Sequence, residues 1–278
     1  MVRAMLGWVA AVGLSLTAGA AAADGAARAF GASGLKSLAT ADDSRGWGAV
    51  GRLDFGKSFC TGTLIDARLV LTAAHCLYDR QGDRIATDRI TFLAGWRDGR
   101  AEAYRGIRRA VVHPDYDPAG DEPTRMTHDL ALLELDRPIA AAEVAPFHTA
   151  PEPRAGAEVA VVSYAHDRAE RPALQEVCHV LGHQQGALIL SCDVDFGSSG
   201  APILDLAGPE PQVVSVVSAK AQMDGTKVSV GTALGWSLGE MRALIAAGDG
   251  VFHRTKPQVL RLSNDAAKAR GGAKFLRP

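Results

Sequence analysis

The sequence lacks an excess of charge of either sign, because its 278 residues include 30 basic and 31 acidic side chains. Nucleic acids are bound mainly by clustered Lys and Arg, so this balance argues against nucleic acid as a partner. We find no internal repeat and no long low-complexity segment, and helical periodicity is nearly absent before residue 237. These absences, together with 30 glycines, favour a chain of short strands and turns.

Long apolar runs are also lacking, except at the N-terminus. Arg3 precedes the apolar run LGWVAAVGLSL, and Ala21 and Ala23 fit an A-x-A cleavage pattern. Residues 1–23 are interpreted as a secretory signal peptide, with a retained N-terminal anchor as the alternative. We therefore expect a secreted or periplasmic protein, without stable membrane insertion after cleavage, in which residues 24–45 form an N-terminal extension or pro-segment.

The C-x-x-C motif is absent as well, which argues against a zinc site made from the four cysteines. In an exported protein, an even number of cysteines favours disulfides. Each cysteine has a partner close in sequence, so of three connectivities we favour the pairs Cys60–Cys76 and Cys178–Cys192.

What the sequence does contain is a series of short apolar patterns typical of strands, in two groups of six. The first group covers residues 47–54, 61–65, 69–73, 89–95, 105–112 and 130–135, and the second covers 157–164, 174–181, 187–192, 201–205, 212–219 and 227–233. One helix follows over 237–247, where Ser237 and Glu240 fit a capping box and Gly248 ends the helix. We expect an all-β protein of two six-stranded antiparallel β-barrels, at about 46–140 and 155–235, with a C-terminal helix.

Three polar residues stand where these strands begin or end. The strand in LVLTAAHC stops at two alanines, so His75 has space beside it, and Asp129 precedes an apolar strand. Ser199 lies between Gly197 and Gly200, which allow backbone N–H groups to turn toward one point beside its hydroxyl. A serine hydroxyl becomes a strong nucleophile when a histidine takes its proton and a carboxylate orients that histidine.

The segments CTGTLIDARLVLTAAHC, HDLALLEL and GSSGAP resemble the three signature segments of the trypsin/chymotrypsin-like serine protease family, over roughly residues 46–247. The resemblance implies a serine endopeptidase with a catalytic cleft between the barrels. His75 would be the general base, Asp129 its orienting carboxylate and Ser199 the nucleophile, with an oxyanion hole from the N–H groups of Gly197 and Ser199. It also implies an acyl-enzyme intermediate, a protein or peptide substrate and no cofactor; we expect a monomer.

The sequence departs from the animal digestive members of this family. Ser198 stands where those enzymes carry an aspartate that pairs with a freed N-terminal amine, and no I-V-G-G start is present. GSSGAP resembles the bacterial branch instead, so we do not expect activity to require a new N-terminus.

The preferred substrate side chain is suggested by a further resemblance. In the trypsin-like branch, an acid six positions before the nucleophile lies at the base of the specificity pocket, and here that residue is Asp193. A carboxylate in that place would favour Arg or Lys, although Lys220 near the pocket wall could neutralise it. The alternative is that Asp193 is only a loop residue.

Two other functions remain open. GSSGA is close to the G-x-S-x-G motif of α/β-hydrolases, but that fold needs the order Ser, Asp, His, and only His253 follows Ser199. A catalytically inactive, protease-like binding module is the stronger alternative.

The remaining polar residues are given structural interpretations. His179 and His183 lie in a strand-like stretch, which does not favour zinc, and His128 is expected on the strand face opposite to Asp129. Asp115 and Asp117 lack a full calcium loop. The residues from 248 to 278 are expected to form a solvated or disordered tail rich in basic side chains (Arg254, Lys256, Arg261, Lys268, Arg270, Lys274 and Arg277). The alternatives are contact with an anionic surface or a removable C-terminal extension.

Overall fold

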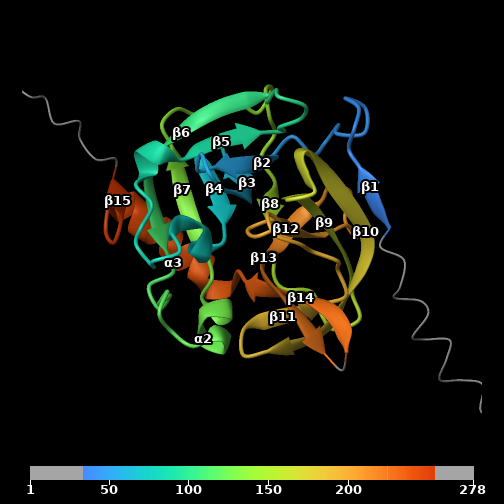
Figure 1. The fold of residues 1–278 in the computed structure, drawn as a ribbon. Coiled ribbons are helices and arrows are strands. Elements are labelled where there is room, and N and C mark those ends of the chain that lie inside the picture. The colour runs from blue at the N-terminus through green and yellow to red at the C-terminus, as the bar shows by residue number, and fades with distance from the viewer. Residues whose placement is uncertain (1–33, 224, 254–278) are drawn as a thin grey trace, which may run out of the picture. The chain divides into compact units, whose positions relative to one another are not determined.

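The computed structural model describes residues 34–223 and 225–253 (Figure 1). The expected signal peptide lies outside these residues, as does the expected tail beyond residue 253. Strands dominate the described part of the chain and pair into two sheets. No helix within it is both long and apolar enough to cross a membrane.

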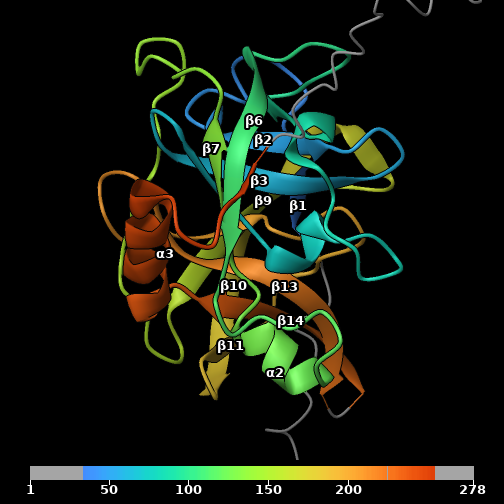
Figure 2. The same cartoon turned by 90° about the vertical axis from the view of Figure 1, so that its left-hand side faces the viewer.

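The first sheet closes into a six-stranded antiparallel barrel. Its strands are β2 (Val50–Asp54), β3 (Phe59–Asp66), β4 (Leu69–Thr72), β5 (Thr91–Ala94), β6 (Ala103–Val112) and β7 (Ala131–Leu135). They pair in the order β6-β5-β2-β3-β4-β7, and a further pairing of β6 with β7 closes the barrel. Every residue of β7 is buried because helix α3 (Gly235–Ala247) packs against β6 and β7 (Figure 2).

The second sheet closes in the same way. Its strands are β9 (Glu158–Ala165), β10 (Arg168–Gln184), β11 (Ala187–Leu190), β12 (Pro202–Asp205), β13 (Gln212–Met223) and β14 (Thr226–Ala233). They pair in the order β10-β11-β14-β13-β12-β9, with β9 and β10 paired to close the barrel. Three short strands add to the two barrels: β1 (Leu35–Ser37) on β10, β8 (His148–Thr149) on β13 and β15 (Phe252–His253) on β6.

The expected fold class is confirmed: the structure has two six-stranded antiparallel barrels and a C-terminal helix. Strand β10 is much longer than the 174–181 segment that the sequence indicated. Its pairing with β9 shifts register twice, and Val177 at the second shift has a φ of 61° and an exposed side chain. Such irregularities interrupt the alternation of apolar and polar residues on which the expected boundaries depend.

The expected capping box on the C-terminal helix is wrong. Helix α3 begins at Gly235, two residues earlier than expected, and its N-cap is Leu234, which forms no side-chain cap. Ser237 therefore lies inside the first turn, where its hydroxyl bonds to His113. Gly248 does end the helix, since its N–H donates to the carbonyl of Leu244 at 2.9 Å.

A short helix that the sequence did not indicate precedes β7. Helix α2 (Glu122–Thr127) has Asp121 as its N-cap, whose carboxylate accepts from the Thr124 N–H at 2.9 Å. His128 is the C-cap of α2, so it lies in the connection to β7 and not on the strand face where we expected it.

Each barrel carries one disulfide, and the two bridges have the nearest-neighbour pairing that we favoured. The Cys60–Cys76 bridge attaches the 3₁₀ helix η1 (Ala74–Leu77) to β3. The Cys178–Cys192 bridge attaches β10 to the loop that follows β11. Each bridge closes a short loop beside one part of the site described below.

The segment before Arg45 packs into the same structure. Strand β1 pairs with β10, with Leu35 opposite Gln175, and the N–H of Leu38 donates to the Pro172 carbonyl at 2.9 Å. Leu38 is completely buried within the hydrophobic core. Residues 35–38 therefore contribute to the folded domain.

Candidate active site

His75 occupies the space left where β4 ends. Ala73 and Ala74 continue the chain from the strand, and both are fully buried because small side chains fit against the barrel. His75 follows on η1, and its side chain keeps 35% of its surface exposed. The Cys60–Cys76 bridge fixes the next residue, so the ring is held at the end of the barrel.

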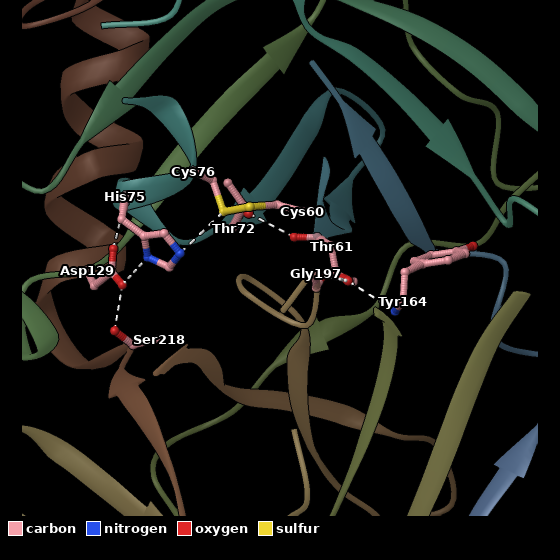
Figure 3. Close-up of a disulfide and its surroundings, with 9 residues drawn as sticks. All are labelled: Cys60, Thr61, Thr72, His75, Cys76, Asp129, Tyr164, Gly197 and Ser218. Carbon is pink, nitrogen blue, oxygen red and sulfur yellow. Dashed lines mark hydrogen bonds and ion pairs between the residues drawn. A yellow bond between two sulfur atoms is a disulfide. The ribbon is translucent and has the colours of Figure 1, made fainter. Parts of the chain in front are cut away.

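Asp129 holds the histidine from the opposite side. Its Oδ1 accepts the backbone N–H of His75 at 2.8 Å, and its Oδ2 lies 2.6 Å from His75 Nδ1 (Figure 3). The hydroxyl of Ser218, on β13 of the second barrel, donates to the same Oδ2 at 2.5 Å. Since a carboxylate only accepts, Nδ1 carries the ring proton, and Nε2 remains free to take one.

The environment tunes the basicity of this histidine. Burial of the ring lowers the pKa of His75, and so does the positive charge of Arg125. The negative charge of Asp129 and its hydrogen bond with Nδ1 outweigh both effects, so the pKa of His75 is raised above its ordinary value of 6.5. The ring is therefore a stronger base than a free imidazole.

Ser199 lies in the loop between β11 and β12, which packs against the first barrel. Its carbonyl accepts the N–H of Thr61 at 2.9 Å. The next residue, Gly200, has a φ of 76°, and a Cβ there would lie 2.0 Å from the Thr72 Oγ1. Only glycine permits this approach, which brings the loop beside the segment that leads from β4 to His75.

The structure brings the three expected residues together to different degrees. His75 and Asp129 are joined directly by two hydrogen bonds. Ser199 is positioned through its backbone, and in the described part of the chain its hydroxyl forms no hydrogen bond. In the absence of substrate, hydrogen bonds between a nucleophile and its base are often long, so this geometry is compatible with catalysis.

The two backbone N–H groups expected to form an oxyanion hole are unused in the part of the chain that the structure describes. Gly197 has a φ of 99°, and its carbonyl accepts the Thr61 hydroxyl at 2.9 Å. The N–H groups of Gly197 and Ser199 have no acceptor among residues 34–223 and 225–253. The N–H between them, from Ser198, instead donates to the carbonyl of Asp195 at 2.9 Å.

Ser198 is the residue that stands in place of the family's aspartate, and it is fully buried. Its hydroxyl lies 3.1 Å from the Ser163 hydroxyl and 3.2 Å from the Tyr164 carbonyl, to which it can donate. The loop before Ser199 is thus anchored by neutral hydrogen bonds inside the second barrel.

A pocket of about 400 Å³ adjoins this loop, and both expected specificity residues line it. Asp193 is exposed, and its N–H donates to the Gln175 side chain at 2.7 Å. The sequence suggested that Lys220 could neutralise Asp193, but the structure does not pair these two residues. Lys220 bonds to Asp195 at 2.8 Å, and its Nζ lies 4.1 Å from the ring centroid of Phe196.

Ser218 is the residue of the candidate site that the sequence did not reveal. It lies in the strand segment VVSVVSAK, where the sequence does not separate Ser218 from Ser215, another buried serine.

The cysteines do not form a metal centre with a histidine in the described part of the chain. Cys60 and Cys76 lie near His75, but both are in a disulfide. Among the described residues, neither His179 nor His183 belongs to a group of three side chains that could hold a metal ion.

Comparisons with known proteins identify the family and agree with the fold. The family described as Trypsin matches residues 39–234. The chain is 42% identical to "Kallikrein-10" of Homo sapiens over 88 residues, which cover 30% of this chain and 30% of that protein. It is 31% identical to "CLIP domain-containing serine protease B10" of Anopheles gambiae over 183 residues, which cover 52% of this chain and 50% of that protein.

These matches span at most half the length of the two relatives. A solved structure described as "Structure of Glu endopeptidase in complex with MPD" superposes with a TM-score of 0.66 at 22% identity, covering 78% of this chain and 98% of that one. At that identity the superposition supports the fold alone.

The dependence of the His75 pKa on Asp129 can be tested directly. In an Asp129→Asn variant, the attracting charge is lost while burial and Arg125 remain, so the pKa of His75 should fall. NMR titration of the His75 ring in a Ser199→Ala background measures this change, with Asp66→Asn as a control for an exposed acid. An unchanged or higher pKa in Asp129→Asn would contradict the electrostatic account.

Proposed function

Because the chain belongs to the trypsin family, we propose that it is a serine endopeptidase that uses His75, Asp129 and Ser199 as a catalytic triad. The observation that carries the proposal is the buried Asp129, which accepts hydrogen bonds from both the backbone and the ring of His75. A structural histidine needs no such carboxylate, whereas a general base needs its tautomer fixed and its positive charge stabilised.

The proposed reaction begins when Nε2 of His75 takes the proton of the Ser199 hydroxyl. Ser199 Oγ then bonds to the carbonyl carbon of the peptide, and the developing oxyanion accepts from the N–H groups of Gly197 and Ser199. His75 returns the proton to the leaving amine, which departs and leaves an acyl-enzyme. Water, deprotonated by His75, then hydrolyses the acyl-enzyme, and the proton returns to Ser199.

Ser199→Ala tests this mechanism. Loss of the nucleophile should reduce kcat by a factor on the order of 10⁶, measured on a peptide library. A fluorophosphonate probe should label the parent protein at Ser199, with Ser58→Ala, at an exposed serine, as the control that keeps the nucleophile. An unlabelled parent protein, or a Ser199→Ala variant that keeps most activity, would favour the inactive binding module instead.

We propose further that the protein acts without a newly formed N-terminus. Support comes from Ser198, whose neutral hydrogen bonds already anchor the loop, and from Leu38, which packs into the core ahead of Arg45. The curated relatives named above come from human and mosquito, so membership of the bacterial branch also remains a proposal, supported by the same serine.

Protein that begins at Asp24 should therefore be as active as any trimmed form. Trimming to Gly46 should instead lower the melting temperature, because it removes β1 and the buried Leu38. Activity that appears only after trimming, measured on the same peptide substrate, would refute the proposal.

For specificity, we propose that Asp193 favours Arg or Lys before the cleaved bond. Among the described residues Asp193 forms no ion pair, whereas Lys220 is paired with Asp195. The Asp193 carboxylate in the pocket is therefore available to a positively charged substrate side chain. Lys227 also lines the pocket and opposes this preference.

A positional-scanning peptide library tests this assignment. The parent protein should prefer Arg and Lys, and Asp193→Ser should reduce that preference by about tenfold, the effect of roughly 1.4 kcal/mol. Asp205→Ser, at the end of β12 and outside this pocket, serves as the control. An unchanged profile in Asp193→Ser would show that Asp193 is only a loop residue.

We also propose that the protein is exported. The two disulfides support this, because such bridges persist in oxidising compartments.

A further inference from the structure

A second group of polar side chains lies next to the candidate active site, where β6 ends and β7 begins. The N–H of His113 donates to the Leu130 carbonyl at 2.9 Å, which brings the two connections together. The rings of His113 and His128 lie with centroids 4.7 Å apart. One ligand atom each from His113, Asp115 and His128 lies within 4.8 Å of the other two.

Hydrogen bonds define the protonation of the buried member of this group. His113 is 5% exposed, and its Nδ1 accepts the Asp115 backbone N–H at 3.1 Å. Nε2 therefore carries the proton and donates to the Ser237 hydroxyl at 2.8 Å. Burial and the neighbouring His128 lower the pKa of His113, against the opposing charges of Asp115 and Glu240, so the ring stays neutral.

We propose that His113, His128 and Asp115 bind a divalent transition metal of the zinc class. Two imidazoles and a carboxylate are a ligand set that zinc prefers, whereas calcium and magnesium prefer oxygen alone. A cation at His113 Nδ1 replaces one backbone hydrogen bond and keeps the bond from Nε2 to Ser237. Histidine ligands generally donate their second N–H in this way, which fixes the tautomer that binds the metal. Because Asp115 is exposed, water has access as a fourth ligand.

The location links this site to the candidate active site. His128 directly precedes Asp129, and α2 before it contributes Arg125 and Met126 to a pocket of about 220 Å³ that also contains His75. A bound cation holds both ends of the segment 113–128 and thereby limits how this pocket wall adjusts to a substrate. If the proposed peptidase function holds, zinc should change KM more than kcat.

Metal binding itself can be tested without relying on activity. The His75→Ala variant removes the partly exposed histidine of the candidate active site as a competing ligand. Titration of this variant with zinc chloride by calorimetry should show one bound ion. Adding His128→Ala should weaken binding by about 100-fold or more, and adding Ser237→Ala, which removes only the outer hydrogen bond, by about 10- to 100-fold. Asp115→Asn, at an exposed position, provides a ligand variant that should not impair folding.

The control is His148→Ala, which removes an exposed histidine outside the group and should leave zinc affinity unchanged. Equal effects of His128→Ala and His148→Ala, or no saturable binding in the His75→Ala background, would overturn the proposal. Binding that requires His75 would place the ion at the candidate active site and also overturn it. Failure of the peptidase proposal would appear separately, as absence of probe labelling at Ser199.

Discussion

One buried carboxylate connects the two barrels. Asp129, at the entrance to β7 of the first barrel, accepts hydrogen bonds from His75 of the same barrel and from Ser218 on β13 of the second. A buried charge is costly unless donors satisfy it, and three hydrogen bonds do so here. His75 and Ser218 both stabilise the same Asp129 carboxylate. The orientation of His75 is therefore coupled to the position of β13, which carries Ser218.

Most of the fold could be predicted from the sequence, because barrel strands alternate apolar and polar residues or, like β7, are mostly apolar and buried throughout. The errors have local causes. The length of β10 was missed because irregular pairing near Val177 interrupts the alternation. Helix α2 has only six residues, too few for a periodic pattern. Ser237 has the sequence of a cap, but the contact with His113, distant in the chain, uses its hydroxyl.

The candidate site was only partly accessible to sequence reasoning. His75, Asp129 and Ser199 stand in recognisable segments, and their resemblance to a family carried the interpretation. Ser218 had no such segment, since a serine within a buried strand shows nothing about the partner of its hydroxyl. The partner of Lys220 depended on the path of a long side chain along the Phe196 ring toward Asp195, and only the folded arrangement determines that path.

Thr61 has a consequence for how the molecule can move. Its N–H and hydroxyl donate to the carbonyls of Ser199 and Gly197, and its Oγ1 accepts the N–H of Tyr164 at 3.2 Å, so one residue of β3 is bonded to two segments of the second barrel. Rotation of one barrel against the other as rigid bodies would break these bonds together. Hinge closure around a substrate, common in enzymes that bind between two domains, is therefore disfavoured. Adaptation to different substrates must come from the loops at the rim.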